Sequence, residues 1–474
     1  MRHSMFLFLA LAVHATALAQ PPTMSPRVRA FVGVDAPLVA LTGVTVIDGT
    51  GAPAAENQVV IIRDGVIAAV GDAAEVNVPA DAEALDLAGR TVLPGMVMMH
   101  EHLFYPAGGG AYNQQTFSFP RLYLAGGVTT IRTTGSINPY ADLNLKRSIE
   151  AGQRLGPRID VTSPYLNGPG LSMLEMRYLD GPDDARRVVS YWADEGVDSF
   201  KAYTLISRAE LGAAIDEAHS RGAKFTAHLC SVTYREAAEL GIDNLEHGFA
   251  VSSDFVADKV PDECPASSAV QQSLLDIDID GAEFQDLLQT LVENGVALTS
   301  TLPVFETFVP GRPPASDRAI DAMSVEAREQ YLRRRATIAV QQDSPWIPLF
   351  DKLMRMERAF VDAGGLLVTG TDPTGYGGIV AGFSNWRAVE LHVESGFTPL
   401  EAIRIATLNG AEYLGIDDRI GSIAAGKLAD LVVVSGNPAT DINDIENVEL
   451  VFKGGVGFDS RRLFESVRGT VGIR

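Results

Sequence analysis

Two β-rich stretches enclose a longer middle segment that has a different pattern of apolar residues. The first stretch, residues 38–93, consists of short β-branched runs that Asp-Gly and Gly-Asp pairs interrupt at hairpin-like spacing, and no helical period fits between them. The second stretch, residues 419–474, has the same character. We therefore predict one small β-sandwich domain that both ends of the chain build together.

The middle segment, residues 94–418, alternates short continuous apolar runs with helical stretches. Such runs are typical of strands buried on both faces, as in a parallel sheet. They occur at Gly95–His100, Val128–Arg132, Arg158–Thr162, Ser199–Tyr203, Lys224–His228, Asn244–His247, Ala297–Thr301 and Leu366–Gly370. Eight strands interleaved with helices predict an α/β fold of the (β/α)₈ TIM-barrel type, whose active site forms at the C-terminal ends of the strands.

Three of the predicted strand-to-helix connections are long, namely Leu103–Phe119, Ser163–Asp184 and Leu302–Gly365. Connections of this length over the mouth of a barrel usually form lids and pocket walls. Elsewhere the connections carry helix-start signals, since Ser207 with Glu210 and Thr398 with Glu401 form capping-box patterns.

The N-terminus is typical of a secretory signal peptide. Arg2 and His3 precede an apolar run from Met5 to Val13, and Ala17-Leu18-Ala19 forms a small-x-small cleavage site. We therefore predict a signal peptide over residues 1–19 and a periplasmic or secreted protein. Such a compartment permits disulfides, but the sequence leaves open whether Cys230 and Cys264 form one.

The net charge of the chain excludes some classes of binding partner. The 474 residues include 38 Lys and Arg against 60 Asp and Glu, a formal net charge of −22. A nucleic-acid binder would need a basic surface to neutralise phosphates, and an anionic lipid surface would be repelled. We expect a small-molecule substrate, no nucleic acid and no membrane. A homo-oligomeric assembly stays open.

Histidines and one aspartate gather at the predicted strand ends. His100 and His102 close the first strand; side chains at i and i+2 lie on the same face, roughly 7 Å apart, so both imidazoles can bind one ion. His228, His247 and Asp372 follow the fifth, sixth and eighth strands. Any one of them alone is more often a core or rim residue, but all lie at the end where a barrel forms its active site.

Lys201 lies among apolar neighbours in the fourth predicted strand. A buried ammonium is costly, so such a lysine pairs with a carboxylate, loses its proton or is chemically modified. Beside metal ions, reaction with CO₂ would convert the amine into a carbamate that bridges two cations. The alternative, a salt-bridge or rim lysine, is equally compatible with the spacing.

Three motifs resemble the metal-dependent amidohydrolase superfamily over nearly the whole chain. They are the first-strand run Leu93 to Leu103, the second-strand run Gly126 to Arg132 and the return Gly421 to Val432. The order H-x-H, Lys, His, His, Asp is similar to the binuclear subtype with a carboxylated lysine, closest to secreted members related to imidazolonepropionase and prolidase. This resemblance implies a hydrolase that cleaves an amide C–N bond, such as a dipeptidase or carboxypeptidase, through a metal-bridging hydroxide.

The resemblance also implies a set of metal ligands. His100, His102 and Asp372 would hold the more buried ion, His228 and His247 the more exposed one, and carboxylated Lys201 would bridge them. Imidazole and carboxylate ligands suit two Zn²⁺ ions, with Mn²⁺, Co²⁺ or Fe²⁺ as alternatives. Asp372 would take a proton from the attacking water and pass it to the leaving nitrogen.

Aromatic and sulfur-containing side chains are expected to wall the mouth. We predict substrate contacts from Tyr203, Tyr105 and Tyr165, with Arg132 binding an anionic group. Further wall residues are expected in the first and third long connections, namely Phe104, Tyr112, Phe117, Phe119, Leu171, Met173, Met176 and Tyr178, and Gly108–Gly110 would let the first connection move. An apolar lining favours dipeptides or N-acyl amino acids with an apolar residue. The alternative is that these aromatics pack only against neighbouring loops.

Two other functions compete with this one. A single metal with unmodified Lys201 would fit a mononuclear cyclic-amide hydrolase or a deaminase of the same superfamily. A non-enzymatic binding protein would be expected to lack a ligand, whereas all six positions are filled.

Overall fold

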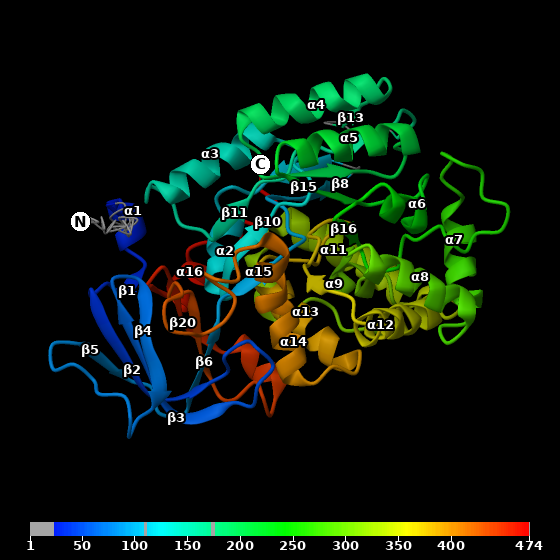
Figure 1. Ribbon diagram of the computed structural model, residues 1–474. Helices are drawn as coiled ribbons and strands as arrows, with labels where there is room; N and C mark the ends of the chain where they lie inside the picture. The colour runs from blue at the N-terminus through cyan, green and yellow to red at the C-terminus, as the bar shows by residue number, and fades with distance from the viewer. Residues whose placement is uncertain (1–22, 109–110, 172–175, 474) are drawn as a thin grey trace, which may run out of the picture.

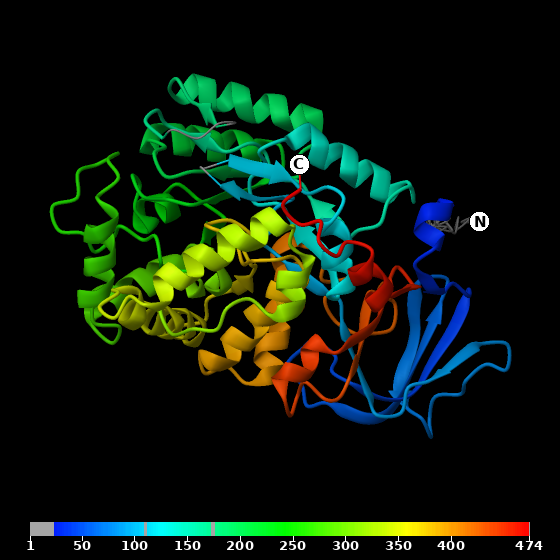
Figure 2. The same ribbon diagram turned by 180° about the vertical axis from the view of Figure 1, so that it is seen from behind.

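The computed structural model describes residues 23–108, 111–171 and 176–473. The predicted signal peptide, Met173 and Gly109–Gly110 lie outside these residues. At one end of the molecule lies a sheet of nine strands (Figures 1 and 2), in the order β1-β21-β20-β19-β6-β2-β3-β4, with β5 also paired to β2. Its strands are β1 (Val32–Val34), β2 (Leu38–Val46), β3 (Ala55–Arg63), β4 (Val66–Asp72), β5 (Glu83–Asp86), β6 (Arg90–Pro94), β19 (Leu431–Ser435), β20 (Val448–Lys453) and β21 (Val456–Asp459).

Both ends of the chain contribute to this sheet. β19 pairs antiparallel with β6, so that Val433 lies opposite Val92, and these two residues belong to one apolar cluster. Thr91 donates a hydrogen bond to the carbonyl of Gly436, 345 residues further along the chain. The last strands are therefore integral to the sheet that the first strands begin.

Each of the eight predicted apolar runs contains a parallel strand. These strands are β7 (Met96–Met98), β10 (Val128–Arg132), β11 (Arg158–Asp160), β14 (Ser199–Ala202), β15 (Lys224–Ala227), β16 (Asn244–Glu246), β17 (Ala297–Ser300) and β18 (Leu367–Thr369). β7, β10 and β11 form one sheet and β14 to β18 another, and a parallel bridge between Thr162 and Ser199 joins them. At the other end of the row, Met99 donates a backbone hydrogen bond to the carbonyl of Thr369. The fold is thus α/β with a long run of parallel strands.

Helices surround these strands (Figure 1). They are α1 (Pro26–Arg29), α2 (Phe119–Ala125), α3 (Pro139–Glu150), α4 (Pro182–Glu195), α5 (Arg208–Ser220), α6 (Tyr234–Glu239), α7 (Ser267–Asp276), α8 (Ala282–Glu293), α9 (Leu302–Glu306), α10 (Asp317–Ala322), α11 (Val325–Ala339), α12 (Trp346–Asp362), α13 (Phe383–Glu394), α14 (Pro399–Ala406), α15 (Leu408–Leu414), α16 (Ser460–Glu465) and the 3₁₀ helix η1 (Ile442–Glu446). Both predicted capping boxes are present, at the starts of α5 and α14. No helix in the described part of the chain is long and apolar enough to cross a bilayer.

The long predicted connections have structure of their own. The first contains the hairpin β8 (Phe104–Gly108) and β9 (Ala111–Gln114), and the second contains the short strands β12 (Leu166–Asn167) and β13 (Arg177–Tyr178). The third is not a loop, because it forms α9 to α12. The sequence prediction of a long loop is therefore wrong there.

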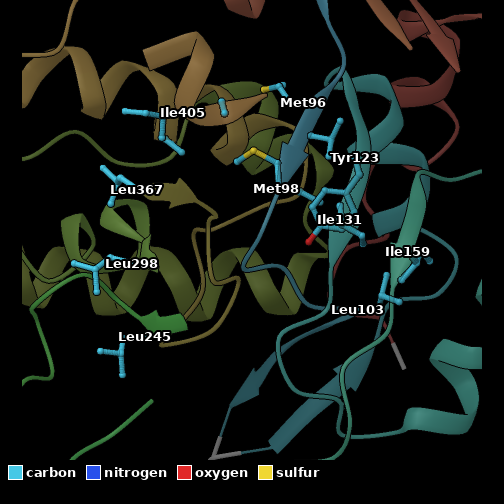
Figure 3. Close-up of a cluster of buried hydrophobic side chains, with 14 of the residues drawn as sticks. Met96, Met98, Leu103, Tyr123, Ile131, Ile159, Leu245, Leu298, Leu367 and Ile405 are labelled. Carbon is cyan, nitrogen blue, oxygen red and sulfur yellow. The ribbon is translucent and has the colours of Figure 1, made fainter. Parts of the chain in front are cut away.

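The two faces of the parallel strands differ in chemistry. Leu245, Leu298 and Leu367 lie side by side in register on adjacent strands and belong to the largest apolar cluster (Figure 3). Residues one position away, such as Asn244 and Glu246, project to the opposite face and join a buried hydrogen-bond network. The apolar face packs against helices, and the polar face lies beneath the strand ends that carry the predicted site.

Candidate metal centre

The predicted ligands converge at the carboxyl ends of the parallel strands. Asp372 Oδ1 lies 3.3 Å from His102 Nε2 and 3.8 Å from His100 Nε2, while Asp372 Oδ2 lies 3.8 Å from His247 Nδ1. Lys201 Nζ lies 3.5 Å from His100 Nε2. The ring of His228 lies 4.4 Å from the ring of His247. All six residues predicted as metal ligands therefore form one cluster.

Two of these residues have an unusual backbone. His247 and Asp372 adopt positive φ angles of 70° and 51°, in the left-handed region that L-residues avoid. Such conformations persist only where the surroundings enforce them, and they are concentrated at functional sites. Here the amide of Asp372 donates to the carbonyl of His100, which fixes the loop beside β7.

Hydrogen bonds to the Nδ1 atoms set the tautomers of the two first-strand histidines. His100 Nδ1–H donates to Glu246 Oε2 at 2.7 Å, and His102 Nδ1–H donates to the carbonyls of Thr133 and Gly135 at 3.0 and 3.2 Å. Because Nδ1 carries the proton in each ring, both Nε2 atoms present a lone pair. Both lone pairs face the carboxylate of Asp372.

This donor set fits a divalent cation. Two bare imidazole nitrogens and a carboxylate are all hydrogen-bond acceptors, and ligand atoms of His100, His102 and Asp372 lie within 4.8 Å of one another. Acceptors gathered this closely repel one another unless a cation lies between them. Imidazole and carboxylate are ligands that Zn²⁺ and related ions prefer.

The imidazoles of His100, His228 and His247 are neutral at physiological pH. Burial, with the charge of Lys201 acting in the same direction, lowers the pKa of His100 to about 4 and that of His228 to about 3. Burial and then the neighbouring imidazole of His228 hold the pKa of His247 well below its usual value. Neutral rings keep the lone pairs that a metal ion requires.

Lys201 is almost fully buried, with 1% of its surface exposed. Burial lowers the pKa of its amine to about 8, against the opposing attraction of Glu246 and Asp372. A lower pKa enlarges the fraction of uncharged amine, which is the form that reacts with CO₂. The amine also lies 5.5 Å from the ring of Tyr165, so the lysine is enclosed between the ligand cluster and an aromatic wall.

Aromatic rings surround the cluster. Phe104 stacks on His102 at 4.4 Å, and Tyr203 packs edge-on against His228 at 4.7 Å. Tyr165 contacts Tyr203 at 5.1 Å. Phe305 of α9, which the sequence analysis did not single out, lies 5.8 Å from His247. Tyr165, Tyr203 and Phe104 therefore lie beside the ligands, as predicted for wall residues.

Two predicted substrate contacts are wrong. Arg132 is fully buried on the polar face beneath the cluster, where its guanidinium donates to Glu246 at 2.6 Å and to Asn244 at 2.8 Å. Tyr105 alternates with Phe104 along β8 and so points into the core, where its hydroxyl accepts from the amide of Gly378. Neither side chain reaches the mouth.

Other predicted wall residues also lie elsewhere. Phe119 is fully buried in the core, and half-exposed Phe117 packs under Arg121, at 3.9 Å. Tyr178 is exposed and bonds to the carbonyl of Leu171, and Met176 lines a surface groove between α3 and α4. Among the members of this group that the structure describes, Phe104 and Tyr112, whose rings contact at 5.1 Å, are the ones that lie beside the ligands.

Two buried glutamates support the site, and the sequence analysis did not predict either of them. Glu246 accepts a hydrogen bond from His100 Nδ1. Burial opposes the ionisation of Glu246, but Arg132 and His100 hold its pKa far below the usual range. Glu101 accepts from the hydroxyl and amide of Thr371 and so anchors the residue before Asp372. In the sequence, Glu246 precedes His247 and Glu101 follows His100. This adjacency to a predicted ligand was the only sequence signal that could have identified them.

Cys230 and Cys264 form a disulfide, with their Cα atoms 4.9 Å apart. The bond connects the segment that follows β15 to the stretch that precedes α7. It closes two residues beyond His228 and so constrains the backbone that presents this ligand.

The fold and the site together define an α/β protein with an imidazole and carboxylate cluster at the carboxyl ends of its parallel strands. The chain belongs to the amidohydrolase family, whose pattern matches residues 91–456. Members of this family generally bind divalent metals, in agreement with the cluster described above.

Relatives of several activities share segments of the sequence. The chain is 40% identical to imidazolonepropionase of Nocardia farcinica over 99 residues, 20% of this chain and 24% of that protein. It is 37% identical to enamidase of Eubacterium barkeri over 86 residues (18% and 21%), and 28% identical to adenine deaminase of Mesorhizobium japonicum over 141 residues (30% and 23%). These matches span about a quarter of the length of each relative.

Solved structures resemble the chain over most of its length. One, described as a "putative prolidase" from Bifidobacterium longum, has a TM-score of 0.64 and 26% identity and covers 91% of this chain and 98% of its own. A bottromycin amidohydrolase reaches a TM-score of 0.69 at 21% identity, over 96% and 95% of the two chains, a likeness of fold.

Proposed function

We propose that this protein is a metal-dependent hydrolase that cleaves an amide C–N bond in small peptides or N-acyl amino acids. The observation that carries the proposal is the cluster of bare His100 and His102 nitrogens facing the Asp372 carboxylate, with Lys201, His228 and His247 beside it. Membership of the amidohydrolase family supports it.

The residues divide into two groups of ligands. His100, His102 and Asp372 would hold one divalent ion, and His228 and His247 a second, with a carbamate on Lys201 between them; Zn²⁺ is the expected metal. Bound divalent ions make water more acidic and polarise a substrate carbonyl.

The remaining chemistry belongs to side chains. Although burial opposes its ionisation, the pKa of Asp372 lies well below its usual range, so the carboxyl group is ionised and can accept a proton. Asp372 would then deliver this proton to the leaving nitrogen. Burial raises the pKa of Tyr203, which therefore stays protonated and can donate a hydrogen bond to the substrate oxygen.

A mononuclear deaminase or cyclic-amide hydrolase is the second candidate. Within the described residues, only His100, His102 and Asp372 have ligand atoms close enough together to form a preassembled site. The segments shared with adenine deaminase and imidazolonepropionase favour the same alternative.

Metal analysis combined with a substrate panel tests both functions. Two metals per chain and cleavage of dipeptides or N-acyl amino acids would support the first proposal. One metal per chain, with ammonia release from aminoheterocycles and no peptide cleavage, would refute it in favour of the second.

Lys201→Ala tests the carbamate, with Lys224→Ala on the neighbouring strand β15 as the matched control. We expect the first variant to lose at least one metal and most activity, with partial rescue by acetate, and the control to keep both. Full metal content and normal rate in Lys201→Ala would contradict a bridging role for this lysine.

We further propose that the eight parallel strands close into a TIM barrel and that residues 38–93 plus 419–474 form a separate domain around residues 94–418. The signal-like N-terminus supports a periplasmic or secreted location. The Cys230–Cys264 disulfide is compatible with it, because disulfides persist in oxidising compartments. A homo-oligomeric state is testable by light scattering.

A further inference from the structure

A cavity of about 670 Å³ lies where the nine-stranded sheet meets α3 and β11. Residues of α1, the end of α3, the connection from α3 to β11 and the turn between β20 and β21 line it. Figure 1 shows α1 between the sheet and α3. The volume of the cavity is in the range of small-molecule sites, which is roughly 300–1,000 Å³.

This cavity is separate from the metal centre. Arg158, which lines it, is the first residue of β11, so the cavity lies at the amino ends of the parallel strands. None of the six predicted metal ligands, all of which the structure describes, is among the lining residues. A molecule bound here does not touch the reacting atoms, and it is therefore not the substrate of the proposed reaction.

The charge of the lining is opposite to that of the whole protein. Among the described residues, two acidic side chains line the cavity, Asp35 and Glu150, although the chain has 60 Asp and Glu. The basic side chains that line it are Arg29, Lys146, Arg154, Arg158, Arg419 and Lys453. An anion is thus attracted to this cavity in a protein whose formal net charge is −22.

Three of these basic side chains already have a carboxylate partner, in the pairs Arg29–Asp35, Lys146–Asp198 and Arg158–Asp430, at 3.3, 2.6 and 3.0 Å. In the part of the chain that the structure describes, no carboxylate lies within 4.0 Å of the charged nitrogens of Arg154, Arg419 or Lys453. Arg154 and Arg419 are exposed, and Lys453 is half-buried. Of the two acidic lining residues, Glu150 is likewise without an ion pair there, so the unpaired charge of the lining is positive.

Lys453 is the lining residue that points most clearly to a ligand. Its Nζ donates to the carbonyl of Gly156 at 2.8 Å, which is the one side-chain hydrogen bond that the described residues give it. An ammonium group has three N–H donors. Burial, with the charge of Arg158 acting in the same direction, lowers the pKa of Lys453 to about 8, against the attraction of Asp430 and Glu150. An anion in the cavity would supply a further acceptor and stabilise the charged amine.

Apolar side chains form another part of the wall. Met24 and Val456 are half-buried, and Leu155 and Phe458 are buried. A ligand that covers the half-buried apolar surface removes it from water, which is favourable. The wall therefore suits a molecule that has an apolar body as well as an anionic group.

We propose that this cavity binds a small organic carboxylate, whose anionic group contacts Arg154, Arg419 and Lys453 and whose apolar body lies against the apolar wall. A guanidinium can bind a carboxylate through two parallel hydrogen bonds. The inference goes beyond the proposed hydrolysis and does not depend on it. A ligand that binds only the folded protein stabilises it by mass action, so an occupied cavity strengthens the contact between the sheet and the parallel strands.

The test compares hexanoate with hexanamide, which replaces the carboxylate by a neutral amide. The proteins are the metal-loaded wild type, the double variant Arg154→Ala with Arg419→Ala, and the control Arg461→Ala with Arg468→Ala. The control removes the same charge from two exposed arginines that do not line the cavity. In calorimetry we expect the wild type to bind hexanoate more tightly than hexanamide. The double variant should bind hexanoate more weakly by about tenfold or more, and the control should bind it as the wild type does.

A second measurement locates the bound carboxylate, because a metal centre can also bind one. Reductive methylation of the Lys453 amine, followed by mass spectrometry, should be slower with hexanoate present and unchanged by hexanamide. Equal affinity for the two compounds, unchanged hexanoate binding in the double variant, or methylation of Lys453 at the same rate with and without hexanoate would each overturn the inference. None of these readouts requires turnover, so failure of the proposed hydrolysis would leave them interpretable.

Discussion

At the scale of single residues, Asp372 is proposed to have two roles, which are to bind a cation and to transfer a proton. Its carboxylate faces three imidazoles, its backbone is left-handed, and the hydroxyl of Thr374 donates to its Oδ1 at 2.8 Å. A residue held in this way has little freedom to reorient, which suits a group that must both bind a cation and transfer a proton.

Asp372→Asn tests the second of these roles. The amide keeps the size and one coordinating oxygen but cannot accept a proton at neutral pH. We expect kcat to fall by about 10²–10⁴, the usual contribution of a general acid–base group, and KM to change far less. Steady-state kinetics at matched metal content measure both values. A rate close to wild type would show that another group transfers the proton.

A second residue offers a pH-dependent test of stability. Glu357 of α12 is buried and forms no ion pair with any residue that the structure describes, and burial raises the pKa of its carboxyl from 4.5 to about 8. Between these two values the folded state holds a proton that the unfolded state releases, so this group makes stability fall as the pH rises through the window and level off above pH 8.

Glu357→Gln removes this titration and keeps the shape. We expect the thermal midpoint of the wild type to drop by at least about 2 °C more than that of the variant between pH 5 and pH 8.5. Differential scanning fluorimetry at several pH values measures the two curves. Parallel curves would mean that Glu357 does not take up a proton on folding.

At the scale of elements, the site depends on how closely β18 approaches β7. A Cβ atom built on Gly370 would lie 2.4 Å from the backbone nitrogen of His100 and 2.5 Å from its Cβ. No side chain larger than hydrogen fits there without moving the strand that carries the H-x-H pair.

Gly370→Ala is therefore expected to displace His100. Overpacking of this kind costs about 1–3 kcal/mol, which lowers the thermal midpoint of a chain of this length by about 1–3 °C, and metal content should fall with it. Gly33→Ala is the matched control, because its Cβ would meet only ordinary contacts at 3.7 Å. Equal metal content and equal midpoints in the two variants would contradict the close approach.

The sequence was most informative for elements with a strong period. All eight apolar runs contain strands, because β-branched and apolar residues buried on both faces leave an unambiguous pattern. Positions in or at the ends of these strands then identified six predicted ligands, which the structure brings into one cluster. The helices α9 to α12 were missed because they lie in one long segment where the pattern gave no clear boundary.

Side-chain direction was harder to predict than position. Tyr105 follows closely after His102 and Arg132 ends the second predicted strand, yet the alternation along β8 and β10 places Tyr105 in the core and Arg132 beneath the site. Phe305 of α9 belongs to no motif, and its ring lies 5.8 Å from His247 only through the packing of that helix. Contacts that depend on such long-range packing leave no local signature.

At the scale of the whole molecule, the disulfide joins two segments separated by 34 residues. Closing a loop of this length reduces the entropy of the unfolded chain by an amount worth about 4 kcal/mol at most. We expect the double variant Cys230→Ser and Cys264→Ser to have a lower thermal midpoint, and a reductant to lower the midpoint of the wild type but not that of the variant. Two titratable thiols in the unreduced wild type would contradict this bond.

Both ends of the chain contribute to the nine-stranded sheet, so the folding of this sheet depends on when each end is synthesised. Thr91 hydrogen-bonds a residue that a ribosome adds 345 positions later, a delay on the order of 20–70 s at about 5–20 residues per second. Throughout that interval β6 lacks its neighbour β19, so one edge of β6 has unpaired backbone groups. The nascent chain therefore cannot complete this sheet before β19 to β21 have been synthesised. Export of an unfolded chain and protection by chaperones are both compatible with such an order of assembly.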